Sequence, residues 1–219
     1  MQKRVVVGYV AVLTLALGGA ARANPINVSE SYSPVLQVDG SSGRATIEIS
    51  QTGVIDDLNI WIDFTKCDNP IAADGTCVGA DRSYNREIEF RLVAPDLRTY
   101  ANLIEENSIT GQNTGARVSY TFDDEASSSY PADSLISGRY IPFDSLSVFD
   151  GLEVAGIWTL FFQDTWGADP LSLNRWGLDI TTAGTKNDPV PEPATMLLLG
   201  SGLAGLAGSR LRRKKRGND

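Results

Sequence analysis

Alternation of apolar and polar residues dominates the sequence between residues 24 and 182. The apolar sets are Ala45, Ile47 and Ile49; Leu58, Ile60, Ile62 and Phe64; Ile88, Phe90 and Leu92; Val118, Tyr120 and Phe122; Trp158, Leu160 and Phe162; and Trp176, Leu178 and Ile180. In an extended strand, a period of two places each set on one face. Each strand can therefore bury one side and leave the other in water, which is typical of antiparallel sheets.

Turn-forming residues separate these segments, among them Gly40 to Gly43, Asn69-Pro70 and Asp150-Gly151. Only residues 102–107 have a mildly helical pattern. Many short strands without a long helix indicate two packed sheets. We therefore expect an all-β fold, a jelly-roll-like antiparallel β-sandwich.

Residue types that are missing or rare exclude several classes of function. The 219-residue chain has no histidine and only two cysteines. It therefore cannot form a Ser-His-Asp or Cys-His catalytic unit, a histidine-based zinc or haem site, or a thiolate zinc or iron–sulfur site. We expect a protein that is not an enzyme.

The formal net charge of −8 is unevenly distributed, because both ends of the chain are basic and the segment between them is strongly acidic. Phosphates of nucleic acids and anionic lipid surfaces repel such a segment. We expect its partners to be cations, neutral or basic polymers, or other proteins, and not nucleic acid.

The N-terminal residues have the pattern of a secretory signal peptide. Lys3 and Arg4 precede an apolar run from Val5 to Leu17, and Ala21-Arg22-Ala23 forms an Ala-x-Ala cleavage site. The run is shorter than the roughly 20 residues that span a bilayer. Residues 1–23 are therefore expected to be removed by signal peptidase.

The C-terminal residues combine three features. Pro191-Glu192-Pro193 is followed by an apolar stretch from Met196 to Ala207 and then by basic residues from Arg210 to Arg216. A short hydrophobic helix before a basic cluster stops translocation and leaves the basic end in the cytoplasm. The acidic segment is then left outside.

In this order and spacing, residues 191–216 resemble the PEP-CTERM sorting signal of Gram-negative bacteria. The resemblance implies an exosortase, a membrane cysteine transpeptidase that cuts near Pro-Glu-Pro and removes the helix. It also implies an inner-membrane intermediate and a mature protein at the cell surface or in the extracellular matrix, where this family is associated with exopolysaccharide and biofilm. The alternative is a permanent single-span anchor.

A second resemblance covers residues 45–183 and is to the P domain, or P/Homo B domain, a β-sandwich that follows the catalytic domain of subtilisin-like proprotein convertases. The similar segments are Gln51 to Ile60, Phe90 to Pro95, Tyr120 to Ala126, Leu146 to Gly151, Gly156 to Leu160 and Trp176 to Ile180. The sequence contains no subtilase catalytic domain. The resemblance therefore implies a non-catalytic module or, alternatively, an accessory to a separately encoded subtilase. Residues 24–44 would lead into the domain and residues 184–190 would link it to the sorting signal.

Cys67 and Cys77 lie in one polar loop of a chain with an export signal. An oxidising compartment favours a disulfide, which would stabilise the fold by about 2–3 kcal/mol in the chain-entropy model. The Cys-x9-Cys spacing is not that of a redox motif, so catalytic use is the weaker interpretation.

Acidic residues gather at the expected strand ends: Asp56, Asp57, Asp123, Asp124, Glu125, Asp164 and Asp169. If the fold brings several of them to one end, their carboxylates can form a calcium site, since Ca²⁺ takes six to eight oxygen ligands. The alternative is that they are solvated turn residues and caps, where Asp is common. A glycosidase-like carboxylate pair is a third and weaker interpretation.

Two of the tryptophans are candidates for a carbohydrate platform. Trp61 lies off the main apolar face of its strand, and Trp166 lies in a loop. The alternative for both is ordinary packing. Trp158 and Trp176 lie on the inward pattern and are expected in the core. The sequence thus predicts an exported surface or matrix protein that binds exopolysaccharide or another surface protein.

Overall fold

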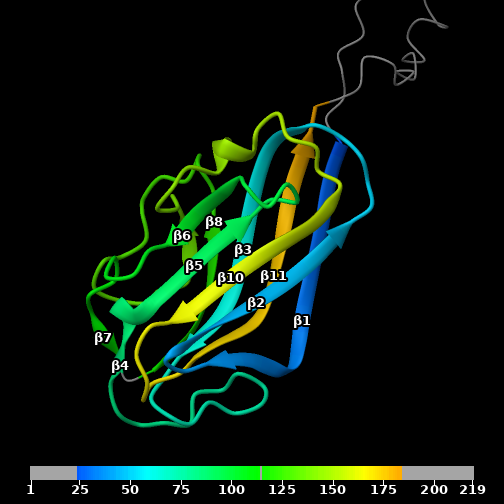
Figure 1. The fold of residues 1–219 in the computed structure, drawn as a ribbon. Coiled ribbons are helices and arrows are strands. Elements are labelled where there is room, and N and C mark those ends of the chain that lie inside the picture. The colour runs from blue at the N-terminus through cyan, green and yellow to red at the C-terminus, as the bar shows by residue number, and fades with distance from the viewer. Residues whose placement is uncertain (1–23, 114, 184–219) are drawn as a thin grey trace, which may run out of the picture. The chain divides into compact units, whose positions relative to one another are not determined.

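The computed structural model describes residues 24–113 and 115–183, which form two main sheets packed face to face (Figure 1). The all-β sandwich expected from the alternating pattern is confirmed. The expected signal peptide (1–23), linker (184–190) and C-terminal helix and basic tail (191–216) lie outside the described residues. Within the described ranges, no helix is long and apolar enough to cross a membrane.

One sheet has five strands in the order β1-β11-β3-β8-β9. Their bounds are β1 Asn24–Val38, β11 Leu171–Thr182, β3 Ile55–Lys66, β8 Ala116–Phe122 and β9 Gly138–Tyr140. The pairs are antiparallel except β8 with β9, which is parallel. β3 and β11 therefore form the centre of this sheet.

The other sheet has four antiparallel strands in the order β2-β10-β5-β6. Their bounds are β2 Ser41–Ile49, β10 Gly156–Asp164, β5 Ile88–Val93 and β6 Tyr100–Ile104. A small ribbon, β4 (Ser83–Tyr84) with β7 (Gln112–Asn113), and two 3-10 turns, η1 (Asn85–Glu87) and η2 (Leu146–Phe149), lie in the connections. Because β3 and β10 belong to different sheets, contacts between their ends join the two layers.

The core fills the space between the sheets with the residues that the alternation singled out. All six alternating sets are buried, and Trp158 and Trp176 are both 0% exposed. Phe64 on β3 packs against Phe90 on β5 with ring centroids 5.1 Å apart, which joins the two sheets. The indole N–H groups are also satisfied, since Trp158 donates to the Val154 carbonyl and Trp176 to the Tyr32 hydroxyl. The core prediction is confirmed.

Two local expectations differ from the structure. Residues 24–44, expected as a lead-in, form β1 and the start of β2, and β1 pairs with β11 in two stretches. The break between these stretches contains Pro34, which has no N–H to donate to the ladder. Residues 102–104 belong to β6, so packing against β5 overrides the mildly helical pattern there.

Candidate functional site

The structure divides the acidic residues predicted as calcium ligands between the two ends of β3. Asp56 and Asp57 lie at the start of this strand, whereas Asp164 and Asp169 lie around Lys66 at its other end. Asp124 and Glu125 join Asp56 and Asp57. The predicted ligands therefore do not form a single site.

At the start of β3, a hollow of about 70 Å³ is surrounded by acidic side chains. Its acidic lining residues are Asp56, Asp57, Asp124, Glu125 and Asp150. We call this set the acidic pocket. Asp150 follows η2 and was not among the predicted ligands, because Asp-Gly in a sequence indicates a turn and carries no sign of a site.

The carboxylates of the acidic pocket repel one another. Burial raises the pKa of Asp57, and the negative charges of Asp123, Asp124 and Asp56 raise it further. Burial also raises the pKa of Asp150, with the charges of Asp57, Asp124 and Asp56 adding to the shift. A positive charge placed here would relieve this repulsion.

Several of these carboxylates already have other partners. Asp124 accepts backbone N–H groups of Leu146 and Ser147, each at 2.9 Å, and so holds the start of η2. Asp123 pairs with Arg139 and accepts the Glu125 N–H at 2.7 Å. In the described residues, no group of three or more such side chains is arranged so that it could hold a metal ion.

At the opposite end of β3, Lys66 is 0% exposed and lies among three carboxylates. Its Nζ is 2.9 Å from Asp164, 3.1 Å from Glu87 and 3.1 Å from Asp169, and it also donates to the Asp169 carbonyl. We call these four residues the buried lysine cluster. The ammonium occupies the place between Asp164 and Asp169 that a calcium ion would need.

Sequence reasoning missed the buried lysine cluster. Lys66 ends an alternating strand and directly precedes Cys67, and a lysine at a strand end is ordinarily solvated. Its partners are between 21 and 103 residues away along the chain. No local pattern therefore pointed to this site.

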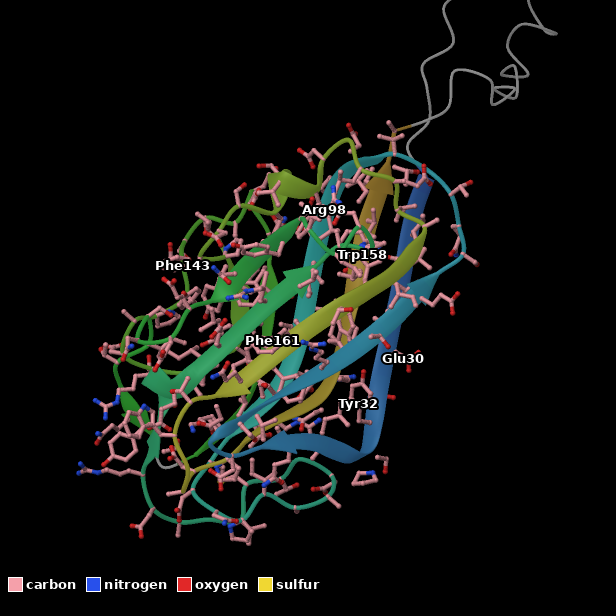
Figure 2. All side chains as sticks on the ribbon, in the orientation of Figure 1. Glu30, Tyr32, Arg98, Phe143, Trp158 and Phe161 are labelled. Atoms are coloured by element: carbon pink, nitrogen blue, oxygen red, sulfur yellow. A yellow bond between two sulfur atoms is a disulfide. The ribbon has the colours of Figure 1, made fainter. Side chains whose placement is uncertain are left out.

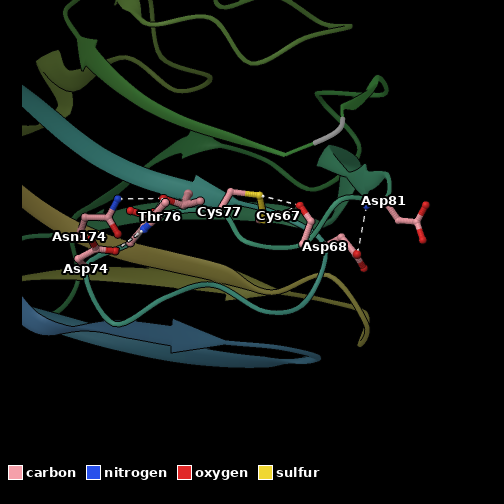
Figure 3. The surroundings of a disulfide bond; sticks show 10 residues. Cys67, Asp68, Asp74, Thr76, Cys77, Asp81 and Asn174 are labelled. Carbon is pink, nitrogen blue, oxygen red and sulfur yellow. Dashed lines mark hydrogen bonds between the residues drawn. A yellow bond between two sulfur atoms is a disulfide. The ribbon is translucent and has the colours of Figure 1, made fainter.

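The predicted disulfide between Cys67 and Cys77 is confirmed (Figure 3). Their loop folds back on the end of β3, where the Thr65 hydroxyl donates to the Gly75 carbonyl at 2.6 Å. The Cys67 N–H donates to the Pro170 carbonyl of the segment before β11. The disulfide loop, which follows Lys66 in the chain, and the segment before β11 thus both contact the end of β3 that carries Lys66.

The two candidate tryptophans differ in their surroundings. Trp61 is half-buried, its ring covers Gly177 of β11, and Arg175 lies over it at 5.6 Å. Trp166, in the loop between β10 and β11, is 66% exposed. Trp166 is therefore accessible to a ligand, whereas much of Trp61 is engaged in packing.

The outer face of the four-stranded sheet presents a further group that sequence reasoning did not single out. Arg91 lies over the rings of Tyr100 and Phe161, at 5.1 and 5.9 Å, and Ile157 on β10 is 52% exposed. We call these four residues the aromatic face. Figure 2 labels Phe161 on β10. Its outward position follows from the alternation, because Leu160 and Phe162 point inward.

Comparison with known proteins identifies the C-terminal segment. Residues 189–214 match the family model of the PEP-CTERM protein-sorting motif. The chain carries this sorting motif. The motif, predicted from Pro191-Glu192-Pro193, is thus confirmed, and it indicates an exported protein that an exosortase processes through a membrane-associated intermediate. No curated protein sequence matches the chain.

Solved structures with some likeness to the chain are distant. The complex of the Aeromonas sobria serine protease with its chaperone ORF2 is 10% identical, with a TM-score of 0.43, over 76% of this chain and 28% of that chain. The serine protease of Aeromonas sobria alone is 10% identical, with a TM-score of 0.43, over 74% of this chain and 27% of that chain. The structure of FlhE is 11% identical, with a TM-score of 0.38, over 74% of this chain and 99% of that chain. The chain therefore spans less than a third of the protease chains that it matches.

Proposed function

We propose that this chain is a non-catalytic component of the bacterial cell surface or extracellular matrix, where its sandwich binds or packs against exopolysaccharide. The observation that carries the proposal is the sorting motif at residues 189–214 following a disulfide-bonded β-sandwich. Export delivers such a sandwich to a compartment where disulfides persist and polymers are the neighbours.

Three properties of the ionisable groups support a non-catalytic role. The buried lysine cluster is at most 4% exposed at each residue, so a substrate cannot reach it. The acidic pocket encloses about 70 Å³, well below the roughly 300 Å³ of a small-molecule site. The chain also lacks histidine, the commonest general base.

The aromatic face and Trp166 are the surfaces that we propose for the polymer. Exposed aromatic and aliphatic side chains on a sheet face mark interaction sites, because their rings offer apolar area at little entropic cost. Tyr100 is 52% exposed and Trp166 is 66% exposed. Arg91 and Asn102, linked by a 2.7 Å hydrogen bond, add polar groups that a hydroxylated chain can bind.

Co-sedimentation with polysaccharide prepared from the matrix of the producing bacterium tests this role. We expect the protein to pellet with the polymer, and Tyr100→Ala and Trp166→Ala to weaken binding while leaving the melting temperature unchanged. Tyr84→Ala, an exposed tyrosine on the separate β4 ribbon, is the matched control. Equal binding by all four proteins would remove the aromatic face and Trp166 from consideration.

The P-domain resemblance supports a second candidate, an accessory module for a separately encoded subtilase. Six ordered segments from Gln51 to Ile180 carry that resemblance. Affinity purification of the tagged chain from the producing bacterium distinguishes the two. Recovery of a subtilase in constant ratio would favour the accessory role, and recovery of polysaccharide without a protease would favour the matrix role.

We further propose that the acidic pocket binds calcium weakly, through Asp56, Asp57 and Asp150. The raised pKa values of Asp57 and Asp150 support it, because a cation relieves the repulsion that causes them. Since no metal arrangement is preformed among the described residues, we expect a Kd of about 10⁻⁴–10⁻³ M, the range of extracellular modules.

Calorimetric titration and thermal melting with and without chelator test the calcium proposal. We expect a calcium-dependent rise in Tm that Asp57→Asn with Asp150→Asn abolishes. Asp96→Asn, an exposed acidic residue in the turn after β5, serves as the matched control and should retain the rise. No rise at millimolar calcium would mean that these residues act only as turn residues.

A further inference from the structure

The buried lysine cluster has more negative than positive groups, although it is sealed from water. Lys66 and Asp164 are both 0% exposed, and Glu87 and Asp169 are each 4% exposed. One ammonium therefore faces three carboxylates in a low-dielectric interior. Burying ions costs free energy that a single pairing does not recover in full, so this composition needs an explanation.

Asp164 is the least satisfied member of the cluster. Its Oδ2 accepts from Lys66 Nζ at 2.9 Å, whereas its Oδ1 is buried without a hydrogen-bond partner among the described residues. Buried carboxylate oxygens are ordinarily hydrogen-bonded, so an unpaired oxygen needs an explanation that the ion pair with Lys66 does not provide.

The pKa values in the buried lysine cluster favour a neutral carboxylic acid at Asp164 next to a charged Lys66. Burial raises the pKa of Asp164 to about 7, against the opposing effect of Lys66 and with the help of the charges of Glu87 and Asp169. Burial also raises the pKa of Glu87. For Lys66, burial lowers the pKa but the three carboxylates raise it, so the ammonium is the main form. Near neutral pH, therefore, carboxylic acid and ammonium lie side by side.

We propose that Lys66 and Asp164 join in an intramolecular isopeptide bond once the domain has folded. Lys66 Nζ, after losing a proton, attacks Cγ of the protonated Asp164 carboxyl group. The new C–N bond replaces the C–OH bond, and the hydroxyl leaves with one proton as water. The Lys66 ammonium, the Asp164 carboxylic acid and the Glu87 carboxylate become an amide, water and a protonated Glu87, without any oxidant, reductant or cofactor.

Glu87 is the group that moves the proton in this step. Its Oε2 is 3.1 Å from Lys66 Nζ, so it can take the ammonium proton before the attack, pass it to the departing hydroxyl, and keep the second proton that the nitrogen loses as the amide forms. Asp169, whose Oδ2 also accepts the Tyr84 N–H, and whose carbonyl accepts from Nζ, holds the amine in place.

Proximity and desolvation both favour the reaction. Groups held next to each other by the fold keep the entropy that a bimolecular reaction would lose, and here Lys66 Nζ is 2.9 Å from Asp164 Oδ2, an oxygen bonded to the Cγ that it would attack. The amide and the protonated Glu87 are both neutral, so the reaction removes two charges from the interior, and the released water leaves for solvent.

The bond would join the two layers of the sandwich covalently. Lys66 ends β3 in the five-stranded sheet, and Asp164 ends β10 in the four-stranded sheet. The residues are 98 positions apart in the chain, so the link closes most of the domain. Unlike the neighbouring Cys67–Cys77 disulfide, it would survive reduction, which suits a protein that stays outside the cell.

Tryptic peptide mapping of the exported chain, denatured and reduced, tests the proposal. An amidated lysine carries no charge, so trypsin would not cut after Lys66. We expect residues 45–82 joined to residues 140–175, at the summed mass of the two peptides less one water, with fragment ions placing the branch at Lys66 and Asp164. Cleavage after Lys66 with an unbranched 140–175 peptide would overturn the proposal and leave a buried ion pair. A branch to residues 87–91 or to Asp169 would overturn the choice of Asp164.

Two controls test whether the branched peptide depends on the folded cluster and on Glu87. Full-length chain kept unfolded in urea from synthesis onward should be cut after Lys66, and refolding should remove that cleavage, because only the fold assembles the cluster. Glu87→Gln keeps the size and a hydrogen-bonding group, and we expect it to fold without the branched peptide. If Glu87→Gln carries the branched peptide at the wild-type level, Glu87 has no part in the proton transfer.

Discussion

Asp63 joins neighbouring strands on the outer face of the five-stranded sheet. From β3 it accepts hydrogen bonds from Arg117 of β8 at 2.8 Å, and from Asn174 and Arg175 of β11 at 2.9 and 3.1 Å. Burial alone would raise the pKa of Asp63, but these partners lower it below its usual value. One carboxylate therefore ties together three adjacent strands.

We predict that Asp63→Asn lowers the free energy of unfolding by about 2 kcal/mol, the scale of a hydrogen bond to a charged group. A group whose folded pKa is depressed contributes stability above its unfolded pKa, near 3.8, and loses it as the pH falls through the folded value. Urea unfolding should therefore show a constant difference from pH 7 to pH 5, and a shrinking one below about pH 3.8.

Asp179→Asn is the matched control on the same sheet. Burial raises the pKa of Asp179, so its ionised form costs stability at neutral pH. The control variant should therefore be as stable as the wild type or more stable at pH 7. A loss equal to that of Asp63→Asn would show that amide substitution, and not loss of the charge, is responsible.

At the scale of elements, the close approach of β1, β11 and β3 depends on Gly177. A Cβ at this position would lie 2.6 Å from the Val28 carbonyl oxygen of β1 and 2.7 Å from the Trp61 ring of β3. Only a glycine leaves room for both neighbours. The Trp61 ring, which the sequence offers as a ligand platform, thus fills the space above this glycine.

We predict that Gly177→Ala destabilises the domain by about 1–3 kcal/mol, because overpacking must displace β1 or the Trp61 ring. Urea unfolding monitored by circular dichroism measures the change. Gly167→Ala is the control, since its nearest contact would be Asp39 Oδ1 at 3.7 Å and the lost freedom of the unfolded chain slightly favours folding. Equal stability of the two variants would contradict the close-approach argument.

At the scale of the whole molecule, the order of strands sets when folding can occur. β11 is the last strand in sequence, yet it lies between β1 and β3 in the five-stranded sheet. Without β11, β1 loses its partner and β3 loses one neighbour. The sandwich therefore cannot close until residue 182 is available.

We predict opposite outcomes for two truncations. A chain that stops after residue 187 should unfold cooperatively with an unchanged melting temperature, because it keeps all the strands of the compact unit that the structure describes. A chain that stops after residue 170 should show no cooperative transition. Thermal melting by circular dichroism checks both. Cooperative melting of the shorter chain would mean that the remaining strands make a sandwich of their own.

The sorting motif at residues 189–214 begins a few residues after β11, the strand that completes the domain. During synthesis, the last strand of the domain therefore leaves the ribosome shortly before the motif does. Removal of the tail after folding would leave every strand in place. The sorting motif and the sandwich are thus separate segments of the sequence.

The sequence by itself determined those features that follow from local patterns. Alternation along Leu58 to Phe64 or Trp158 to Phe162 decides which side of a strand is apolar, whatever its neighbours are. Likewise, Pro191-Glu192-Pro193 with its apolar and basic followers is a linear signal. Cys67 and Cys77 are close in the chain, and their pairing needed only an oxidising compartment.

Only the tertiary structure decided which charged residues meet. Asp56, Asp124 and Asp150 come together because η2 and the end of β8 pack near the start of β3. Asp164 and Asp169 lie at the other end because β10 and β11 flank the end of β3 there, around Lys66. Strand order depends on long-range packing and loop closure. Residues that meet in this way are far apart in the sequence and show no shared local pattern.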